Sequence, residues 1–374
     1  DKAALERSGA VAQGHSAINT YVGDNSPEDY VRMVRNDLMG IVREDLIYVL
    51  GTHVDDSVHL FEEWGMPIWK KSEEGKTLDG KKGQKMGTLK AGATPVRTGK
   101  WQIIINGESY KRIVAEDAKM AIGEDNVLER VFIVELLLDA NKENQIAGAV
   151  GFSVRENKVF IIKCKSMMVA CGGAVNIYQP RSVGEGKGRA WYPVWNSGST
   201  YTLAMKVGAE LSMMENRFTP ARFKDGYGPV GAWFLLFKAK TLNGLGENFA
   251  ASDAAKAELE RYAPYGTAAI TPTCLRNHLM LFEMKEGRGP IMMDTVTALA
   301  ELGKTMDKKE LKHLESEAWE DFLDMTCGQA NLWCATNTEP EKKNSEVMPT
   351  EPYLLGSHSG CCGLWTSGPD LDWV

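Results

Sequence analysis

A short apolar run followed by two glycines is the clearest pattern in this sequence. Residues 167–170 are apolar, Gly172 and Gly173 follow, and a loop rich in glycine and serine leads to a helical pattern over residues 200–209. A continuous apolar run of this length between turn residues is typical of a buried strand in a parallel sheet. Glycine at its end lets a ligand approach the backbone closely. The pattern predicts a nucleotide site or an ordinary strand-to-helix connection, and its shape favours the two equally.

Helical periodicity is found on both sides of this stretch. Ser26 and Pro27 followed by acidic residues are typical of a helix start, and apolar positions with helical spacing follow them. A second helix is expected over residues 44–64. Glu108 and Ser109 are expected to cap a third. The helices predicted beyond that point cover residues 110–122, 251–262, 274–286, a stretch from residue 293 on, and 307–327.

Strand patterns are shorter. Residues 101–105 and 131–138 are expected to be strands. Residues 146–154 and 159–163 flank the turn residues 155–158, as in a β-hairpin. The resulting order of helix, helix, strand, helix, strand, hairpin, strand and helix predicts an α/β cofactor domain with an inserted β-meander.

Three polar segments interrupt these patterns. The loop that contains Ser8, Gly9, Gln13 and Gly14 is small and polar, which suits a segment lying along a cofactor or a plain linker. Residues 70–100 are rich in Lys, Gly and Glu, which predicts a mobile surface insertion, with a functional basic patch as the alternative. A polar linker is expected at residues 337–346.

Composition places the chain among soluble globular proteins. A length of 374 residues suggests roughly two or three domains, and 43% hydrophobic residues supply an ample core. The net charge of −7 argues against a nucleic-acid binder, and no apolar run reaches the ~18 residues of a membrane span. The seven cysteines form no CxxC pair. This favours reduced thiols in a cytoplasmic protein and argues against an iron–sulfur cluster within this chain.

Three long motifs carry a resemblance to a known family. RSVGEGKGRAWYPVWNSGS (residues 181–199), NRFTPARFKDGYGPVGAWF (216–234) and PTEPYLLGSHSGCCG (349–363) are similar to the α subunits of dissimilatory adenylylsulfate (APS) reductases. Those proteins belong to the fumarate reductase/succinate dehydrogenase flavoprotein superfamily, whose consensus the shorter motifs FEEWGMP, ACGG and EGRGP also resemble. The resemblance covers essentially the whole chain. It implies an α/β fold with an FAD-binding Rossmann-like domain of fumarate reductase type and an inserted α+β capping domain.

The same resemblance implies a division of the chain. Residues 1–215 correspond to a partial FAD-binding domain, 216–345 to the capping and substrate domain, and 346–374 to a return to the FAD-binding domain. The superfamily begins with a strand and a GxGxxG turn that cradles the FAD pyrophosphate, and neither is found from Asp1 on. The resemblance therefore implies an internal fragment, incomplete at both ends.

Departures from the superfamily pattern limit the reactions that the resemblance implies. Succinate and fumarate enzymes usually carry a His that bonds the flavin covalently where this chain has Gly9, so FAD is expected to be noncovalent. They also carry a substrate-binding His where Pro352 precedes Tyr353. The region of their catalytic Arg corresponds ambiguously to residues 276–278. Dicarboxylate chemistry is disfavoured, although another flavoprotein oxidoreductase, such as a fumarate reductase or an L-aspartate oxidase, stays the alternative. A nucleotide-binding or purely structural α/β protein is a third hypothesis.

The reaction implied by the resemblance interconverts APS plus two electrons with AMP and sulfite, through an adduct of sulfite with flavin N5. It would serve sulfate reduction or sulfur oxidation. The electrons are expected to come from a small ferredoxin-like β subunit in a heterodimer, so that iron–sulfur clusters lie only on this partner. An indirect link to a membrane electron-transfer complex is compatible with this arrangement, and no nucleic-acid partner is expected.

Two residues are the candidates for catalysis. Arg222 is always charged and can grip phosphate or sulfate with two hydrogen bonds; without the resemblance, a surface ion pair is the competing interpretation. His358 lies between glycines in GSHSG, where it would donate to sulfite oxygens and titrate near neutral pH. Taken alone, His358 is better explained as a core histidine.

The other candidates would hold the substrate or the cofactor. The substrate-binding candidates are Asn19, Glu108, Trp191, Phe218, Phe234 and Leu235. The cofactor-binding candidates are Ser8, Gly9, Gln13, Gly14, Ala170, Gly172, Gly173, Asn196 and Ser197. Without the resemblance, the aromatic residues would be assigned to the core and Glu108 to a helix cap. No metal ligand is expected.

Overall fold

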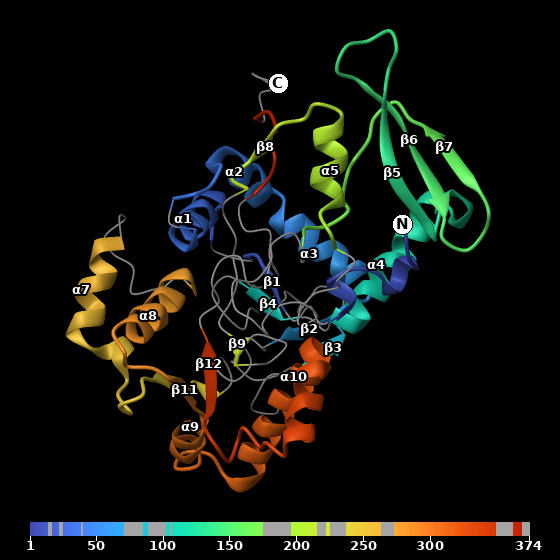
Figure 1. The fold of residues 1–374 in the computed structure, drawn as a ribbon. Helices are drawn as coiled ribbons and strands as arrows, with labels where there is room; N and C mark the ends of the chain where they lie inside the picture. The colour runs from blue at the N-terminus through green and yellow to red at the C-terminus, as the bar shows by residue number, and fades with distance from the viewer. Residues whose placement is uncertain are drawn as a thin grey trace.

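The computed structural model describes most of the chain (Figure 1). The described residues are 1–13, 17–21, 25–38, 40–70, 85–88, 102–104, 107–174, 196–214, 222–224, 237–262, 273–348 and 362–368. Within these ranges every strand pairing is antiparallel, so the expected parallel sheet is not found among them. None of the described helices combines the length and apolar character needed to cross a membrane.

The N-terminal part is mainly helical. Its elements are the 3-10 helices η1 (Leu5–Arg7) and η2 (Val11–Gln13), strand β1 (Ala17–Asn19), and helices α1 (Pro27–Asp37), α2 (Glu44–Thr52) and α3 (Val54–Glu63). The predicted start of α1 is confirmed, because the Ser26 hydroxyl accepts a hydrogen bond from the Asp29 backbone N–H at 3.2 Å.

The single helix expected over residues 44–64 is two helices, so that prediction is wrong. The Tyr21 hydroxyl donates to the carbonyl oxygen of Gly51 at 2.7 Å. Gly51 also lies so close to α1 that an added Cβ would be 3.2 Å from the Cα of Pro27. These contacts hold the last turn of α2, and the chain leaves helical geometry at His53. The apolar periodicity continues through His53, so the sequence pattern does not indicate the break.

Two small ribbons precede the next helix. Strand β2 (Pro67–Lys70) pairs with β3 (Lys85–Thr88), and β1 pairs with β4 (Gln102–Ile104). The strand predicted at residues 101–105 is confirmed by β4, whereas most of the predicted 70–100 insertion lies outside the described residues. Helix α4 spans Gly107–Ile122. Glu108 and Ser109 therefore lie within the helix, and their prediction as a preceding cap is wrong.

The β-meander is confirmed almost residue for residue. Strands β5 (Val131–Leu138), β6 (Ile146–Ser153) and β7 (Val159–Lys163) form an antiparallel sheet in that order. The sheet projects beside helix α5 (Ser199–Lys206), as Figure 1 shows. Leu136, Ala149 and Leu203 join the sheet to α5 in one buried cluster.

The apolar run at residues 167–170 is not a strand, so this prediction is wrong. Met167 and Val169 pack against the cluster of Leu136 and Leu203, whereas Met168 is 90% exposed. The run is an extended segment with one buried face. An uninterrupted apolar run cannot by itself distinguish this arrangement from a strand buried on both faces.

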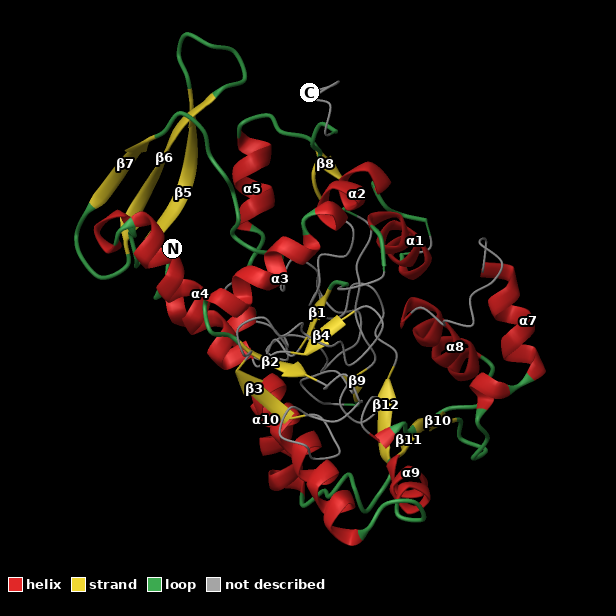
Figure 2. Ribbon diagram, turned by 180° about the vertical axis from the view of Figure 1, so that it is seen from behind, coloured by secondary structure: helices red, strands yellow, loops and turns green. Residues whose placement is uncertain are grey.

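A four-stranded sheet organises the C-terminal part. Its order is β10 (Lys240–Leu242), β11 (Ile291–Asp294), β12 (Ser345–Met348) and β9 (Arg222–Phe223). A separate pair joins β8 (Leu211–Ser212) to β13 (Gly363–Leu364). The remaining elements are η3 (Glu124–Asn126), η4 (Phe249–Ala251), α7 (Asp253–Tyr262), α8 (Thr273–Lys285), α9 (Thr295–Leu302) and α10 (Lys308–Thr336). Helices α7 and α8 lie side by side in both views (Figures 1 and 2).

One predicted helix start in this part is wrong. Met293 and Asp294 belong to β11, and α9 begins at Thr295 because the Asp294 side chain accepts a hydrogen bond from the Thr297 backbone N–H. The predicted linker at 337–346 runs into β12, which continues the sheet as far as Met348. The division at 215/216 and 345/346 stays a prediction.

One hydrophobic cluster joins this sheet to α10. Phe223, Ile291 and Val347 are each at most 2% exposed, and they come from three neighbouring strands. The ring of Trp333 meets the ring of Phe223 edge to face, with their centroids 4.8 Å apart. The core of the C-terminal part therefore lies between α10 and the strand that contains Arg222.

A capping box begins α10, and it allows a test of stability. The Asp307 carboxylate accepts from the backbone N–H groups of Lys309 and Glu310, and Glu310 accepts in return from the Asp307 N–H. We expect Asp307→Ala in the full-length protein to lower the free energy of unfolding by about 1 kcal/mol, because these helical N–H groups lose their acceptor. Urea denaturation measures this loss. Lys308→Ala at the exposed neighbouring position is the control, and an equal effect of both changes would contradict the prediction.

Candidate functional site

A glycine turn and a short helix form the first part of the site. Gly172 has φ = +77°, a conformation that favours glycine. The position of a Cβ on Gly172 would be 3.3 Å from Nδ2 of Asn196, so this side chain lies against the turn. Ala174 forms a single antiparallel bridge with Ser197. The structure thus brings together two segments of predicted cofactor-binding residues that are more than twenty positions apart.

The N-terminus of α5 lies at the same place. Gly198, with φ = +85°, is the N-cap, and as a glycine it has no side chain with which to cap the first turn. The Thr200 hydroxyl donates to the carbonyl oxygen of Gly172 at 2.9 Å, which ties the helix to the turn. Free N–H groups in the first turn of a helix favour an anionic group. Of the other predicted residues here, Ala170 is exposed and Gly173 is half-buried.

The loop around Ser8 and Gly9 is fixed by local contacts. The Ser8 hydroxyl donates to the Asp1 carboxylate at 2.8 Å. The Leu5 backbone N–H donates to Glu129, a bond that lowers the pKa of this carboxyl together with the ion pair to Lys119. Gly9 has φ = +80°, and apart from its two chain neighbours no described residue lies within 4 Å of the position of its missing Cβ. The loop therefore presents open backbone at Gly9, and Ser8 serves to hold its shape.

Arg222 is placed by its backbone in β9. It pairs with Met348 of β12, the last described residue before the predicted His358 motif. Two residues along the chain, Lys224 is held by its backbone bond to Glu346 and by an ion pair with the Glu346 carboxylate at 3.0 Å. The described strands therefore fix the main chain at Arg222 and at the two residues that follow it.

The other predicted site residues are placed only in part. Asn19 ends β1 opposite Gln102, and Glu108 is the second residue of α4; their side chains, like that of Gln13, are not described. The predicted residues that lie outside the described ranges are Gly14, Trp191, Phe218, Phe234, Leu235 and His358.

The ambiguous region at residues 276–278 lies in α8. His278 Nε2 is 2.9 Å from a carboxylate oxygen of Glu258 on α7. This hydrogen bond is the main reason for the lowered pKa of Glu258, with a second from Arg261. His278 thus serves the contact between two helices.

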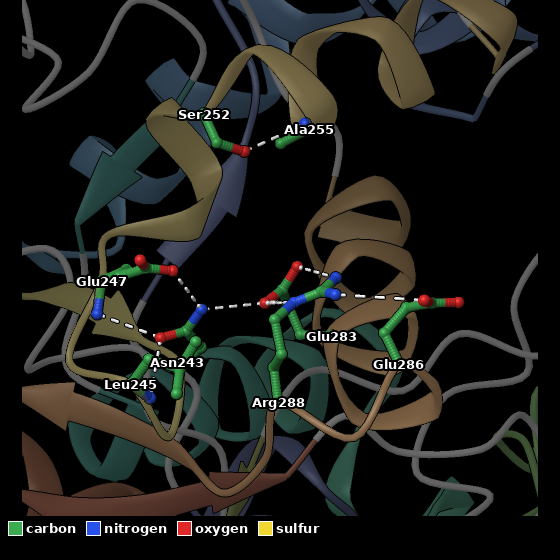
Figure 3. Close-up of polar contacts among 8 residues, drawn as sticks. All are labelled: Asn243, Leu245, Glu247, Ser252, Ala255, Glu283, Glu286 and Arg288. Carbon is green, nitrogen blue, oxygen red and sulfur yellow. Dashed lines mark hydrogen bonds and ion pairs between the residues drawn. The ribbon is translucent and has the colours of Figure 1, made fainter.

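A buried polar cluster near the end of α8 was not found from sequence. Its members are Asn243, Glu283 and Arg288 (Figure 3), and Arg288 belongs to the EGRGP motif. The pKa of the Glu283 carboxyl is lowered. The hydrogen bonds from the Arg288 guanidinium have the largest effect, burial acts against them, and the Asn243 amide lowers the pKa further. The motif marked Arg288 alone. No local pattern marked Asn243, which is forty residues away from Glu283.

The described residues fit a flavin nucleotide at the glycine turn. They supply backbone at Gly172 and Gly173, the amide of Asn196, and a helix N-terminus whose N-cap is a glycine, which are donors suited to phosphate and hydroxyl groups. Among the described residues, no group of three or more His, Cys, Asp or Glu side chains gathers as a metal site would require.

Comparison with known proteins finds relatives that match nearly the whole of this chain. The chain is 68% identical over 375 residues to the adenylylsulfate reductase subunit alpha of Megalodesulfovibrio gigas, a match that covers all of this chain and 56% of that protein. A solved adenosine-5-phosphosulfate reductase in complex with sulfite, as a covalent adduct, is 53% identical with a TM-score of 0.85, over 99% of this chain and 55% of that one. The chain thus spans about half the length of these relatives.

A more distant match concerns the fold alone. The E. coli quinol fumarate reductase FrdA is 13% identical, with a TM-score of 0.63 over 94% of this chain and 55% of that one. The predicted fold class, an FAD-binding fold of fumarate reductase type, is confirmed. The family model described as FAD binding domain matches residues 6–226, which is more than half of the chain. The chain therefore belongs to the FAD binding domain family.

Proposed function

We propose that this chain is the catalytic portion of an adenylylsulfate reductase α subunit, which interconverts APS plus two electrons with AMP and sulfite. The observation that carries the proposal is the 68% identity to such a subunit over the whole chain. The 53% identical structure in complex with sulfite supports the same substrate class. The activity is proposed for the full-length protein, since the chain spans about half of its relatives.

FAD is the proposed cofactor, bound without a covalent link. Gly172, Gly173 and Asn196 at the turn, with Ser197 before α5, would hold it from one side, and the loop of Ser8 and Gly9 from another. Gly9 offers no side chain that could bond to the flavin. FAD supplies the two-electron chemistry when it is bound. The residues of this chain bind it, orient it and exclude water.

Anionic substrates require fixed positive charge near the flavin. AMP, sulfite and APS are all anions, and Arg222 is the candidate that stays charged at any working pH. Its guanidinium would hold a phosphate or sulfite group with two charge-assisted hydrogen bonds. The described pairing of β9 with β12 supports a rigid backbone for this role. His358 would act beside it as a donor to sulfite oxygens. The other proposed contacts to substrate are Asn19, Glu108, Trp191, Phe218, Phe234 and Leu235.

Electrons are proposed to come from a ferredoxin-like iron–sulfur β subunit in the cytoplasm. Four cysteines have side chains that the structure describes, Cys164, Cys171, Cys334 and Cys362, and none of these four is in a disulfide. The described residues also contain no cluster of three or more possible metal ligands. Clusters on a separate subunit are consistent with this arrangement. A link to a membrane electron-transfer complex would run through that partner.

The proposed activity can be tested with the full-length protein and its iron–sulfur partner. We expect AMP-dependent oxidation of sulfite, measured with an artificial electron acceptor. Arg222→Ala should lower kcat/KM for AMP about 100-fold or more, because a charge-assisted bidentate contact is lost. Lys224→Ala is the matched control, since Lys224 is an exposed cation two positions away that is paired with Glu346. Reoxidation of the reduced enzyme by fumarate, without reaction with sulfite, would instead favour the fumarate reductase type.

The proposed flavin contact at Gly172 allows a separate test. We expect Gly172→Ala to weaken FAD binding by about tenfold, because the new methyl group displaces Asn196, a proposed contact to the flavin nucleotide. Gly208→Ala is the control: Gly208 has φ = +87° and open space around it, so the strain is similar but no flavin contact changes. Fluorescence titration of the apoprotein with FAD measures both. Equal FAD affinities of the two variants would contradict the proposed contact.

A further inference from the structure

Asn243 is the centre of a hydrogen-bonded cluster with no spare capacity. It is 2% exposed, and its amide oxygen accepts from the backbone N–H groups of Leu245 and Glu247, both at 3.0 Å. Its amide nitrogen donates to the carboxylates of Glu247 at 3.1 Å and Glu283 at 3.0 Å (Figure 3). Two donors and two acceptors are all that an asparagine side chain offers, so every one is used.

Both oxygens of the Glu283 carboxylate also accept hydrogen bonds. It is 7% exposed, and it receives Nε and Nη2 of Arg288, each at 2.8 Å, in a bidentate pair. The Asn243 amide takes a further lone pair of the same carboxylate. Glu286 lies nearby, 3.9 Å from the Arg288 guanidinium, but it is exposed and outside this hydrogen-bonded set. The Arg288 side chain is half-buried, so its removal would leave the charge of the more deeply buried Glu283 uncompensated.

The cluster fastens two loops of the sheet together. The Gly244 backbone N–H donates to the carbonyl oxygen of Arg288 at 2.7 Å. A Cβ on Gly244 would lie 2.2 Å from the carbonyl oxygen of Gly289, so the two backbones are in direct contact. One loop directly follows β10, and the other directly precedes β11. The cluster therefore fixes the point at which β11 enters the sheet.

A short path leads from this point to Arg222. Ile291, three residues after Arg288, pairs with Val347, and Val347 pairs with Phe223. These three side chains are at most 2% exposed. Neighbouring strands are ~4.8 Å apart, so the backbone of β9 is about 10 Å from that of β11. The paired residues on β11, β12 and β9 are all buried, so a shift of β11 would move β9 with it.

We propose that Asn243, Glu283 and Arg288 are positioning residues for the reaction centre. They fix β11, and through β11 and β12 they hold the strand that carries Arg222. The inference rests on the role of Arg222 in the proposed function. It also assigns Arg288 a different role from substrate binding, because two of its donors are bound to a buried carboxylate.

The test compares Glu283→Gln with Glu286→Gln in the full-length protein with its iron–sulfur partner. Glutamine at position 283 keeps the shape but removes the charge and sets an amide N–H₂ against the Arg288 donors. We expect about tenfold lower kcat in AMP-dependent sulfite oxidation per bound flavin, with unchanged flavin content. Hydrogen–deuterium exchange should become several-fold faster in residues 222–224 and 345–348. Glu286→Gln should change none of these quantities.

The outcomes are separable. Unchanged exchange in those two segments, or a wild-type kcat per flavin, would overturn the inference.

A second variant is used if Glu283→Gln yields no flavin-containing protein. Arg288→Lys then replaces it, since lysine keeps the charge but loses the bidentate contact. A wild-type kcat per flavin in this variant overturns the proposal, and a reduced one supports it. Recovery of both variants only as unfolded protein would assign the cluster a purely structural role and overturn it too. An inactive wild-type protein would instead contradict the proposed function, whereas the exchange measurement reports on the cluster independently.

Discussion

The register of three strands is the constraint on which the C-terminal part of the structure depends. Ile291, Val347 and Phe223 come from segments far apart in sequence, and they meet side by side in the core. Side chains alternate between the faces of a strand, so a slip by one residue would turn them out of the core. The contact of Phe223 with Trp333 adds α10 to the same core. The strand that contains Arg222 is therefore positioned by the burial of the neighbouring residue, Phe223.

The glycine turn at the other part of the candidate site depends on a different kind of contact. Gly172 takes a positive φ, its carbonyl oxygen accepts from Thr200, and Asn196 lies against its Cα. These contacts join two loops to a helix N-terminus, a place whose backbone N–H groups suit an anionic ligand. The proposed reaction requires both parts, because a flavin held at the turn must meet anionic substrates beside a fixed cation.

We propose different roles for the arginines in two of the family-like motifs. The half-buried Arg288 of EGRGP is paired with the buried carboxylate of Glu283, so its charge is compensated within the protein. The motif around Arg222 has no equivalent assignment from the described contacts, and we propose that it provides charge to the substrate. A sequence motif identifies an arginine in both cases. Whether the charge of such an arginine is compensated within the protein or is available to a ligand depends on the presence of a carboxylate beside it.

Local patterns in the sequence determined the elements whose stability is local, and long motifs determined the family. The meander at β5–β7, the start of α1 and the extent of α8 follow from alternation, capping residues and helical period, which act over a few neighbouring positions. The sequence could also nominate Gly172 and Asn196 as cofactor residues, but not their contact. Tertiary structure alone decided the break at His53, the single buried face of residues 167–170 and the assembly of Asn243 with Glu283. Each of these depends on a hydrogen bond or packing contact with a residue remote in the chain, and periodicity within one segment contains no information about that partner.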